Sequence, residues 1–176
     1  TEIYTLSLHD ALPISVSGGR FLQGHTRNFG GFGHISVDPQ GPLCICGNRG
    51  CLSLLGSALG LARHYRDITH VDKSPEEVSA LILDGDPQAE KALGQTCRCL
   101  AIAIGAAINF MDPEQVLISG GLASLGETLL EPLRKELMAC VFPELLVEIA
   151  IECGALGVHA GAMGAALFAR DFPPEG

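Results

Sequence analysis

Residues 30–52 read GGFGHISVDPQGPLCICGNRGCL and carry the strongest signal in the sequence. The stretch holds one histidine and three cysteines at the spacing His34-x9-Cys44-x-Cys46-x4-Cys51. Three thiolates and one imidazole form a closed tetrahedral donor set for Zn²⁺, with no position left open for catalysis. We therefore predict a structural zinc site at these four residues. Two alternatives are three small buried hydrophobic side chains, or one disulfide with a spare thiol.

The composition is that of a folded protein without a basic surface. Of 176 residues, 47% are hydrophobic and 18% are charged, which argues against a disordered chain. Eleven Lys and Arg against 20 Asp and Glu leave a net charge of −9, so no nucleic-acid partner is expected through this chain. The longest apolar run, residues 100–110, is too short to span a membrane. An odd total of seven cysteines, three of them clustered, favours a reducing cytoplasm.

Start and stop signals along the chain predict an α/β domain. A hairpin is expected at 16–32, strands at 34–37, 115–119 and 145–151, and helices at 52–65, 75–84, 87–110, 124–139 and 160–170. Capping-box spacings begin at Ser74 and Ser124. The small residues of segment 87–110 mark it as the buried central helix. Cysteines outside the cluster, at positions 97, 99, 140 and 153, are interpreted as core thiols.

The first fourteen residues, TEIYTLSLHDALPI, resemble the translation of a common sequencing adapter. We therefore interpret residues 1–14 as non-native and leave them out of the fold prediction. The predicted domain covers 15–171, with a tail at 172–176. The expected consequence is a chain that lacks the N-terminal part of its parent.

Gly30–His34 and Cys44–Leu52 together resemble the signature of the ROK family, which comprises bacterial sugar kinases, sugar-responsive repressors and uncharacterised relatives. The likeness continues through Asn109–Pro113, Ile118–Leu122 and Ala160–Ala166. This resemblance implies an actin-like, ribonuclease-H-like fold of two domains, with ATP and a sugar between them. It also implies that the present chain is the C-terminal half of that fold, including the zinc-binding loop at 34–51.

The same resemblance assigns a sugar-binding side to this half. His34 would contact the substrate, and two glutamates that bind sugar hydroxyls in the family correspond to Gly31 and Ser53. Each missing carboxylate removes a charge-assisted hydrogen bond of about 1.5–3 kcal/mol. The expectation is weakened binding of a hexose or N-acetylhexosamine.

Gly120, Gly121 and Leu122 lie between a predicted strand and a predicted helix, where backbone can approach a nucleotide. A plain strand–helix turn explains the pattern equally well, because the spacing is not that of a dinucleotide fingerprint. Resemblance favours a loop against the adenosine of ATP. The phosphate loop, the Mg²⁺ site and the catalytic Asp would lie in the first domain. We therefore expect no catalytic residue and no kinase activity in this chain.

Three functions stay open at this stage. The first is a truncated, glucokinase-like ROK kinase whose full-length parent phosphorylates a hexose or N-acetylhexosamine with ATP and Mg²⁺. The second is a sugar-sensing ROK repressor without its N-terminal helix-turn-helix, which the missing carboxylates mildly favour. The third is a stand-alone, zinc-stabilised interaction domain. The resemblance is also consistent with a homodimer.

Overall fold

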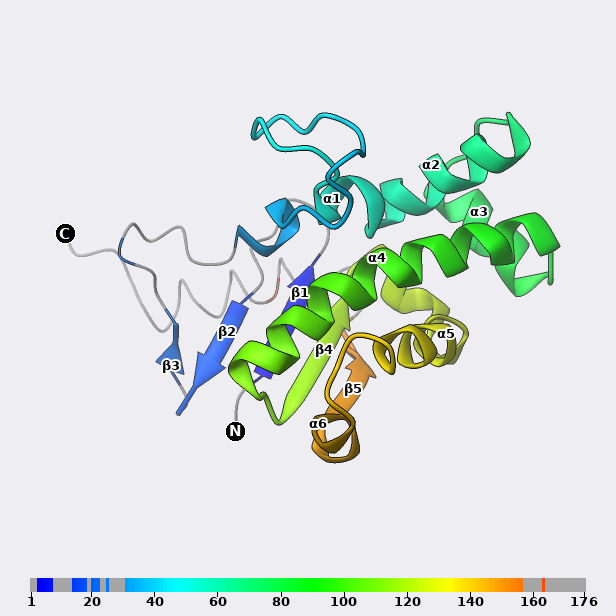
Figure 1. Ribbon diagram of the computed structural model, residues 1–176. Helices are drawn as coiled ribbons and strands as arrows, with labels where there is room; N and C mark the ends of the chain where they lie inside the picture. The colour runs from blue at the N-terminus through cyan, green and yellow to red at the C-terminus, as the bar shows by residue number, and fades with distance from the viewer. Residues whose placement is uncertain are drawn as a thin grey trace.

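Five strands form one sheet in the order β3-β2-β1-β4-β5 (Figure 1). The computed structural model describes residues 3–7, 14–18, 20–22, 25, 31–156 and 163. The strands are β1 (Ile3–Ser7), β2 (Ile14–Ser17), β3 (Arg20–Phe21), β4 (Gln115–Ser119) and β5 (Ala150–Cys153). Strands β1, β4 and β5 are parallel, whereas β1, β2 and β3 are antiparallel neighbours. The predicted α/β class is confirmed.

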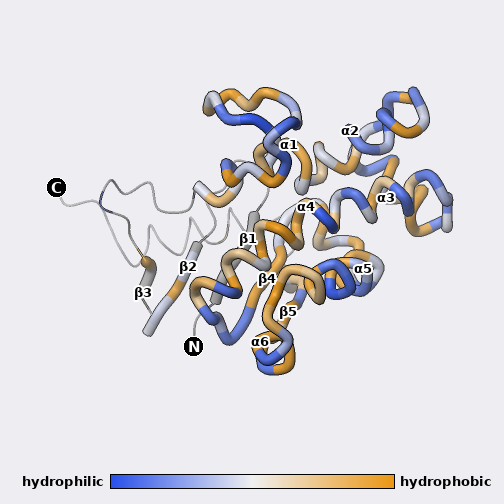
Figure 2. The backbone as a smooth tube through the Cα atoms, in the orientation of Figure 1, coloured by the Kyte–Doolittle hydropathy of each residue, from blue (hydrophilic) through white to orange (hydrophobic). Residues whose placement is uncertain are grey.

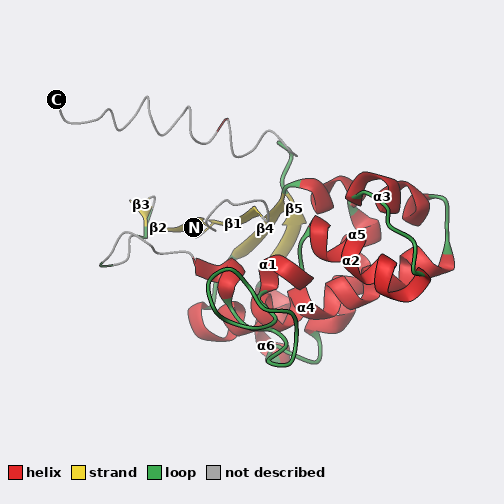
Figure 3. Ribbon diagram, turned by 90° about the horizontal axis from the view of Figure 1, so that it is seen from above, coloured by secondary structure: helices red, strands yellow, loops and turns green. Residues whose placement is uncertain are grey.

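Six α-helices and two 3₁₀ turns are present in the described residues. The helices are α1 (Leu52–Leu55), α2 (Ala58–Thr69), α3 (Pro75–Leu83), α4 (Pro87–Met111), α5 (Glu127–Leu137) and α6 (Pro143–Glu148). The 3₁₀ turns are η1 (Gly31–His34) and η2 (Gly121–Leu125). Seen from above, the helices lie to one side of the strands (Figure 3).

Helix α4 is the centre of the hydrophobic core, and its apolar stretch lies in front of the sheet in the view of Figure 2. Its residues Leu100, Ile104 and Ile108 follow one another at helical spacing and are almost completely buried. A Cβ at Gly105 would lie 2.7 Å from the Cβ of Cys140, so only glycine lets α4 approach the segment after α5 this closely. Among the described residues, α4 is also the one helix long and apolar enough to cross a membrane, but half of its most apolar window is buried in the fold.

Three sequence signals that depend on local chemistry are confirmed. Ser74 and Glu77 form the predicted capping box of α3, with both hydrogen bonds present. Asp86 caps α4 through its carboxylate, and Pro87 occupies the first turn. Strand β4 has the predicted bounds. Residues within or next to α3, α4 and β4 therefore determine where these elements begin.

Two predictions next to the cysteine loop are wrong. Residues 34–37 form no strand, because His34 ends η1 and only Ser36 makes an isolated bridge, to Cys51. The predicted helix at 52–65 is divided into α1 and α2. Ser57 breaks it, because its side chain caps α2 by accepting a hydrogen bond from Gly60 N at 3.1 Å.

Two further boundaries differ from prediction. Ser124 does not cap a helix, because its hydroxyl donates to the Gly121 carbonyl at 2.7 Å within η2, and α5 begins after Gly126. The strand expected at 145–151 is instead α6, which Pro143 opens, followed by β5. The helix predicted at 160–170 lies outside the described residues, Met163 excepted.

The N-terminal hairpin is confirmed in a shorter form, with Val16 opposite Phe21 and Gly18 in the left-handed conformation. Strand β1, from the segment left out of the prediction, pairs in parallel with β4 in the register Tyr4 to Val116. This pairing describes the backbone conformation of residues 3–7. The origin of these residues is a separate question about the gene.

Candidate metal centre

The metal loop, residues 34–51, lies above α1 in Figure 1, and backbone hydrogen bonds bring its two ends together. Val37 N donates to Gly50 O at 2.9 Å, and Gly50 N donates to Pro42 O at 2.9 Å. Gly50 has φ +59, and a Cβ there would lie 1.8 Å from Asp38 O. No other residue type fits position 50, so this glycine brings the two ends of the loop together.

Two polar side chains also hold the loop and were not predicted. The Ser36 hydroxyl donates to Arg49 O at 2.6 Å, and the Arg49 guanidinium donates to Gly41 O at 3.3 Å. Both bonds join residues far apart in the loop. Neither position has a distinctive spacing, so no signal in the sequence identifies them.

The side chains of the four predicted ligands converge on one small region of the loop. The donor atoms of His34, Cys44, Cys46 and Cys51 all lie within 4.8 Å of one another. Cys46 Sγ is 3.5 Å from Cys51 Sγ, and Cys44 Sγ is 3.6 Å from His34 Nδ1. Tetrahedral ligands with metal–sulfur bonds of about 2.3 Å are separated by about 3.8 Å. The observed separations fit a four-coordinate metal ion, and the cluster could hold one.

The environments of the three thiols differ. Cys46 is exposed, whereas Cys44 and Cys51 have exposed fractions of only 5% and 0%. A hydrogen bond from the Cys46 backbone N–H lowers the pKa of Cys44 to about 6. Burial raises the pKa of the Cys51 thiol to about 12. A bound cation would stabilise all three thiolates, because metal ligation displaces the thiol protons.

The loop has almost no hydrophobic support of its own. Ile45, between two of the ligands, is 99% exposed, and Leu43 is 65% exposed. Only Val37, Cys44 and Cys51 of the loop's hydrophobic residues are buried. The backbone hydrogen bonds therefore stabilise the loop, and an ion held by the donor cluster would add to them.

Positions 31 and 53, predicted to face sugar, lie beside the metal loop on the same corner of the domain. Turn η1 packs against α1, since a Cβ at Gly33 would lie 3.6 Å from the Cβ of Ser53. Gly31 is exposed, and a Cβ built there meets none of the described atoms within 4 Å. Position 31 therefore has room for a longer side chain directed away from the core.

The glycine loop lies at the carboxyl end of β4. Gly120 has φ +87, a conformation suited to glycine. A Cβ at Gly121 would lie 3.4 Å from the Cβ of Ala58 at the start of α2. Leu122 is 1% exposed, so its side chain belongs to the core and only its backbone could face a ligand. Segment 53–58 therefore joins η1 at one end to the glycine loop at the other.

The remaining thiols and histidines form no second cluster among the described residues. Cys97 is completely buried, and burial raises its pKa to about 12, as expected of a core thiol. Cys99 is half-buried, and burial raises its pKa to about 11. Burial also lowers the pKa of His64, whose Nε2 lies 3.0 Å from the Leu55 carbonyl oxygen. His159 lies outside the described residues.

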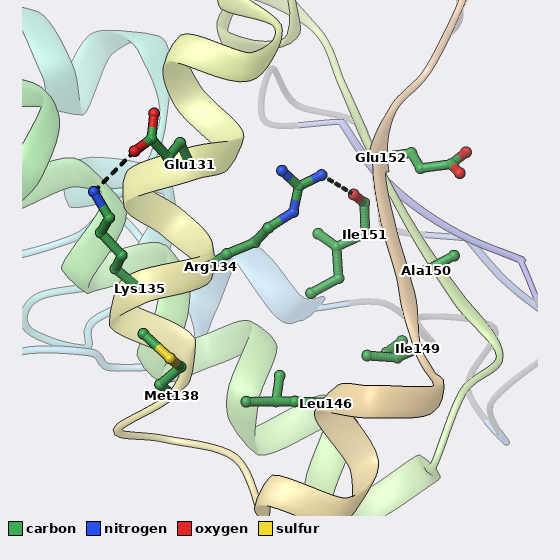
Figure 4. Close-up of a pocket in the computed structure, with 9 residues that line it drawn as sticks. All are labelled: Glu131, Arg134, Lys135, Met138, Leu146, Ile149, Ala150, Ile151 and Glu152. Carbon is green, nitrogen blue, oxygen red and sulfur yellow. Dashed lines mark hydrogen bonds and ion pairs between the residues drawn. The ribbon is translucent and has the colours of Figure 1, made fainter.

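A shallow groove of about 620 Å³ lies between α5, α6 and β5, away from the metal loop (Figure 4). Its charged side chains already have partners. Arg134 donates to Glu127 at 2.7 Å and to the Ile151 carbonyl at 3.1 Å, and Lys135 bonds Glu131 at 2.9 Å. No candidate residue from the sequence lines this groove, so it is not the candidate site.

The fold and the loop define an α/β domain with a cluster of three cysteines and one histidine that could hold a metal ion. The sequence profile of the ROK family matches residues 15–172, and the chain belongs to that family. The glucokinase of Thermotoga maritima is 31% identical over 170 residues, covering 89% of this chain and 54% of that protein. The chain thus spans about half the length of the curated relatives it matches.

Solved structures agree on the fold. A ROK family glucokinase from Streptomyces griseus, in complex with glucose and AMPPNP, matches with a TM-score of 0.84 and 25% identity, covering 97% of this chain and 60% of that one. A ROK family transcriptional regulator, a homologue of the E. coli MLC protein, matches with a TM-score of 0.72 and 30% identity, covering 86% of this chain and 41% of that one. The predicted actin-like fold is confirmed over this half.

Proposed function

We propose that this chain is the zinc-stabilised C-terminal half of a cytoplasmic sugar kinase. The full-length parent would transfer a phosphoryl group from ATP to a hexose or N-acetylhexosamine. The observation that carries the proposal is the shared corner at segment 53–58, where Gly33 approaches Ser53 and Gly121 approaches Ala58. The turn proposed to face the sugar and the loop proposed to face the nucleotide therefore both contact segment 53–58.

Zinc is the metal that the donor set favours. Three thiolates and an imidazole at tetrahedral separations are the ligands of closed, structural zinc sites. Such an ion would hold the loop and take no part in phosphoryl transfer, since no position is open for substrate. His34 is the one ligand outside segment 44–51, so the ion would also tie η1 to the loop.

The chemistry of transfer would be divided between two halves. In this chain, η1 and α1 would face the sugar, and the backbone of Gly120 and Gly121 would face the adenosine. Phosphoryl transfer also needs a carboxylate near the attacking hydroxyl and Mg²⁺ at the phosphates. We assign both to the first domain, so the chain alone should show no kinase activity. A homodimer through this domain belongs to the same proposal, to be measured by light scattering.

A sugar-sensing repressor is the second candidate. Gly31 and Ser53 stand where the resemblance implies carboxylates, and a protein that only senses sugar needs no tightly positioned hydroxyl. Similarity to a ROK transcriptional regulator supports the same alternative. The acidic charge of the chain is compatible with both, because a repressor would contact DNA through its separate helix-turn-helix.

The upstream gene sequence separates the two. Re-sequencing the source gene across the junction of residues 14 and 15 should replace the adapter-like segment with coding sequence for a first domain. A phosphate loop and a catalytic Asp there would support the kinase, and an added helix-turn-helix would support the repressor. A genuine junction would overturn the interpretation of residues 1–14 and favour a zinc-stabilised interaction domain.

Activity of the recovered full-length protein tests the kinase directly. With ATP, Mg²⁺ and glucose or N-acetylmannosamine, we expect phosphorylated sugar with a high KM. Gly31→Glu and Ser53→Glu should each lower KM, since a charge-assisted hydrogen bond contributes about 1.5–3 kcal/mol. Leu59→Glu, which adds a carboxylate at another exposed position of the same corner, is the control. Absence of turnover in the full-length protein and in all variants would contradict the kinase proposal.

A further inference from the structure

We propose that the metal loop is also a thiol switch, in which a peroxide joins Cys46 to Cys51 as a disulfide and expels the zinc ion. The inference rests on the zinc site proposed above and adds to it a chemical signal that would empty that site. It is carried by the different exposure of the three thiols and by the short distance between two of them.

Cys46 is the sulfur that an oxidant would reach. It is exposed and follows Ile45, which is 99% exposed, at the outer end of the loop. Cys44 and Cys51 are 5% and 0% exposed. Oxidation of thiolates follows their accessibility as well as their ionisation, so the first reaction should occur at Cys46.

Cys51 is the sulfur placed to complete the disulfide. Its Sγ lies 3.5 Å from Cys46 Sγ, and a disulfide needs a separation of about 2.05 Å. The intervening segment contains Gly47 and Gly50, both with positive φ, and closes into a tight turn. Cys44 is separated from Cys46 by a single residue, so a bond between those two would be strained.

The chemistry balances with the peroxide as the only co-reactant. The Cys46 thiolate attacks one peroxide oxygen, the O–O bond breaks and hydroxide leaves, which gives a sulfenic acid. The Cys51 thiolate then attacks Cys46 Sγ and displaces a second hydroxide. Two thiolates are oxidised by two electrons to one disulfide, and hydrogen peroxide is reduced to two hydroxide ions. Zinc keeps only His34 and Cys44, and dissociates.

The oxidised loop would stay closed, but the zinc ion would no longer join it to His34 of η1. The disulfide and the backbone bonds Gly50 N to Pro42 O and Cys44 N to Asn48 O remain. The Cys51 thiol, which now donates to the His34 carbonyl, would lose its hydrogen in the disulfide. His34 would then keep the contact of its Nδ1 with Cys44 Sγ at 3.6 Å and a long 3.5 Å bond from Asn48 Nδ2 to its carbonyl. Oxidation would therefore loosen the turn that carries Gly31, next to the proposed sugar side.

The test uses the zinc-loaded chain, hydrogen peroxide and a chromophoric zinc chelator. We expect release of one zinc per chain, a mass loss of two hydrogens, and a Cys46–Cys51 disulfide in the peptide map. Dithiothreitol with added zinc should restore the starting state. Cys46→His keeps four donors but removes the exposed thiol, and should release zinc at least tenfold more slowly. Cys99→Ser, a half-buried thiol outside the cluster, should behave as the parent chain.

The outcomes separate the switch from the zinc site. A chain purified and reconstituted without any bound zinc would overturn both. Zinc bound but retained under peroxide would overturn the switch alone, and so would release without the Cys46–Cys51 disulfide. Equal release rates for Cys46→His and the parent chain would also overturn it. If Cys46→His binds zinc poorly, the peptide map of the parent chain still decides, because it shows directly whether the Cys46–Cys51 disulfide forms.

Discussion

The metal loop and the pair of helices α4 and α5 are stabilised by different forces. In the helix pair, Leu129, Leu133 and Leu137 repeat every four residues and are completely buried. In the loop, Ile45 and Leu43 are exposed, and four donor atoms meet within 4.8 Å. Hydrophobic burial therefore stabilises the helices, whereas backbone hydrogen bonds and, in our proposal, metal ligation stabilise the loop.

This difference has a consequence for function. The turn η1, next to the proposed sugar side, is joined to the metal loop, which contributes only Val37 to the hydrophobic core cluster. Conditions that remove metal should change this turn while the core remains folded. Substitutions in the core should do the reverse.

Removal of one ligand should have the largest effect. Cys46→Ser should abolish stoichiometric zinc binding and cost several kcal/mol of loop stability, because ligation free energy is folding free energy in such sites. Cys46 is exposed, so the loss would not come from a cavity. Metal analysis and chelator competition measure it. Stoichiometric zinc in Cys46→Ser would contradict the four-ligand site.

Truncation of a side chain in the hydrophobic core should have the second-largest effect. Leu133 is completely buried, and Leu133→Ala should lower the free energy of unfolding by about 2–5 kcal/mol through lost burial and a new cavity. Zinc content should stay unchanged. Leu83→Ala, at a position 64% exposed in α3, is the control and should change stability by about 0.5 kcal/mol or less. Urea unfolding of the zinc-loaded chains compares the two, and equal losses would show that the buried core is misassigned.

Two glycines of the metal loop differ in the space that surrounds them. Gly47 and Gly50 both have positive φ, but only a Cβ at Gly50 would collide with Asp38 O, at 1.8 Å. Gly47→Ala should cost about 1 kcal/mol of backbone strain. Gly50→Ala should cost clearly more and weaken zinc binding at least tenfold. Titration with zinc in the presence of a competing chelator measures both, and the reverse order would contradict the observed closure of the loop.

The sequence predicts those elements whose chemistry is local. Ser74, Asp86 and their prolines determine where α3 and α4 begin, and the four residues of the donor cluster are identified by spacing and residue type alone. The failures lie where a second local hydrogen bond competes with the expected one. Ser57 breaks a helical pattern by accepting from Gly60 N, three residues further on, and Ser124 donates to Gly121 O, three residues earlier, instead of capping α5. Gly31 and Ser53 could be placed only through the family resemblance, because a missing carboxylate leaves no pattern of its own.

The smallest effect expected is on the pH dependence of stability. Burial lowers the pKa of His64 in the folded chain, so the fold favours the neutral imidazole. This contribution is fully present above the ordinary pKa of about 6.5 and is lost as the pH falls below it. His64→Gln should therefore flatten the pH dependence of unfolding between pH 7.5 and 5.5. Urea unfolding at several pH values measures the difference, and an unchanged pH dependence in His64→Gln would contradict the role given to this histidine.

Hydrogen exchange of the chain with and without a zinc chelator tests the central claim most directly. With one zinc per chain, amides of the metal loop and η1 should be protected. After chelation their exchange should accelerate, while amides of α4 and α5 should keep their protection. Unchanged exchange in residues 31–51 after complete metal removal would contradict the account, and so would equal loss of protection in the loop and the core.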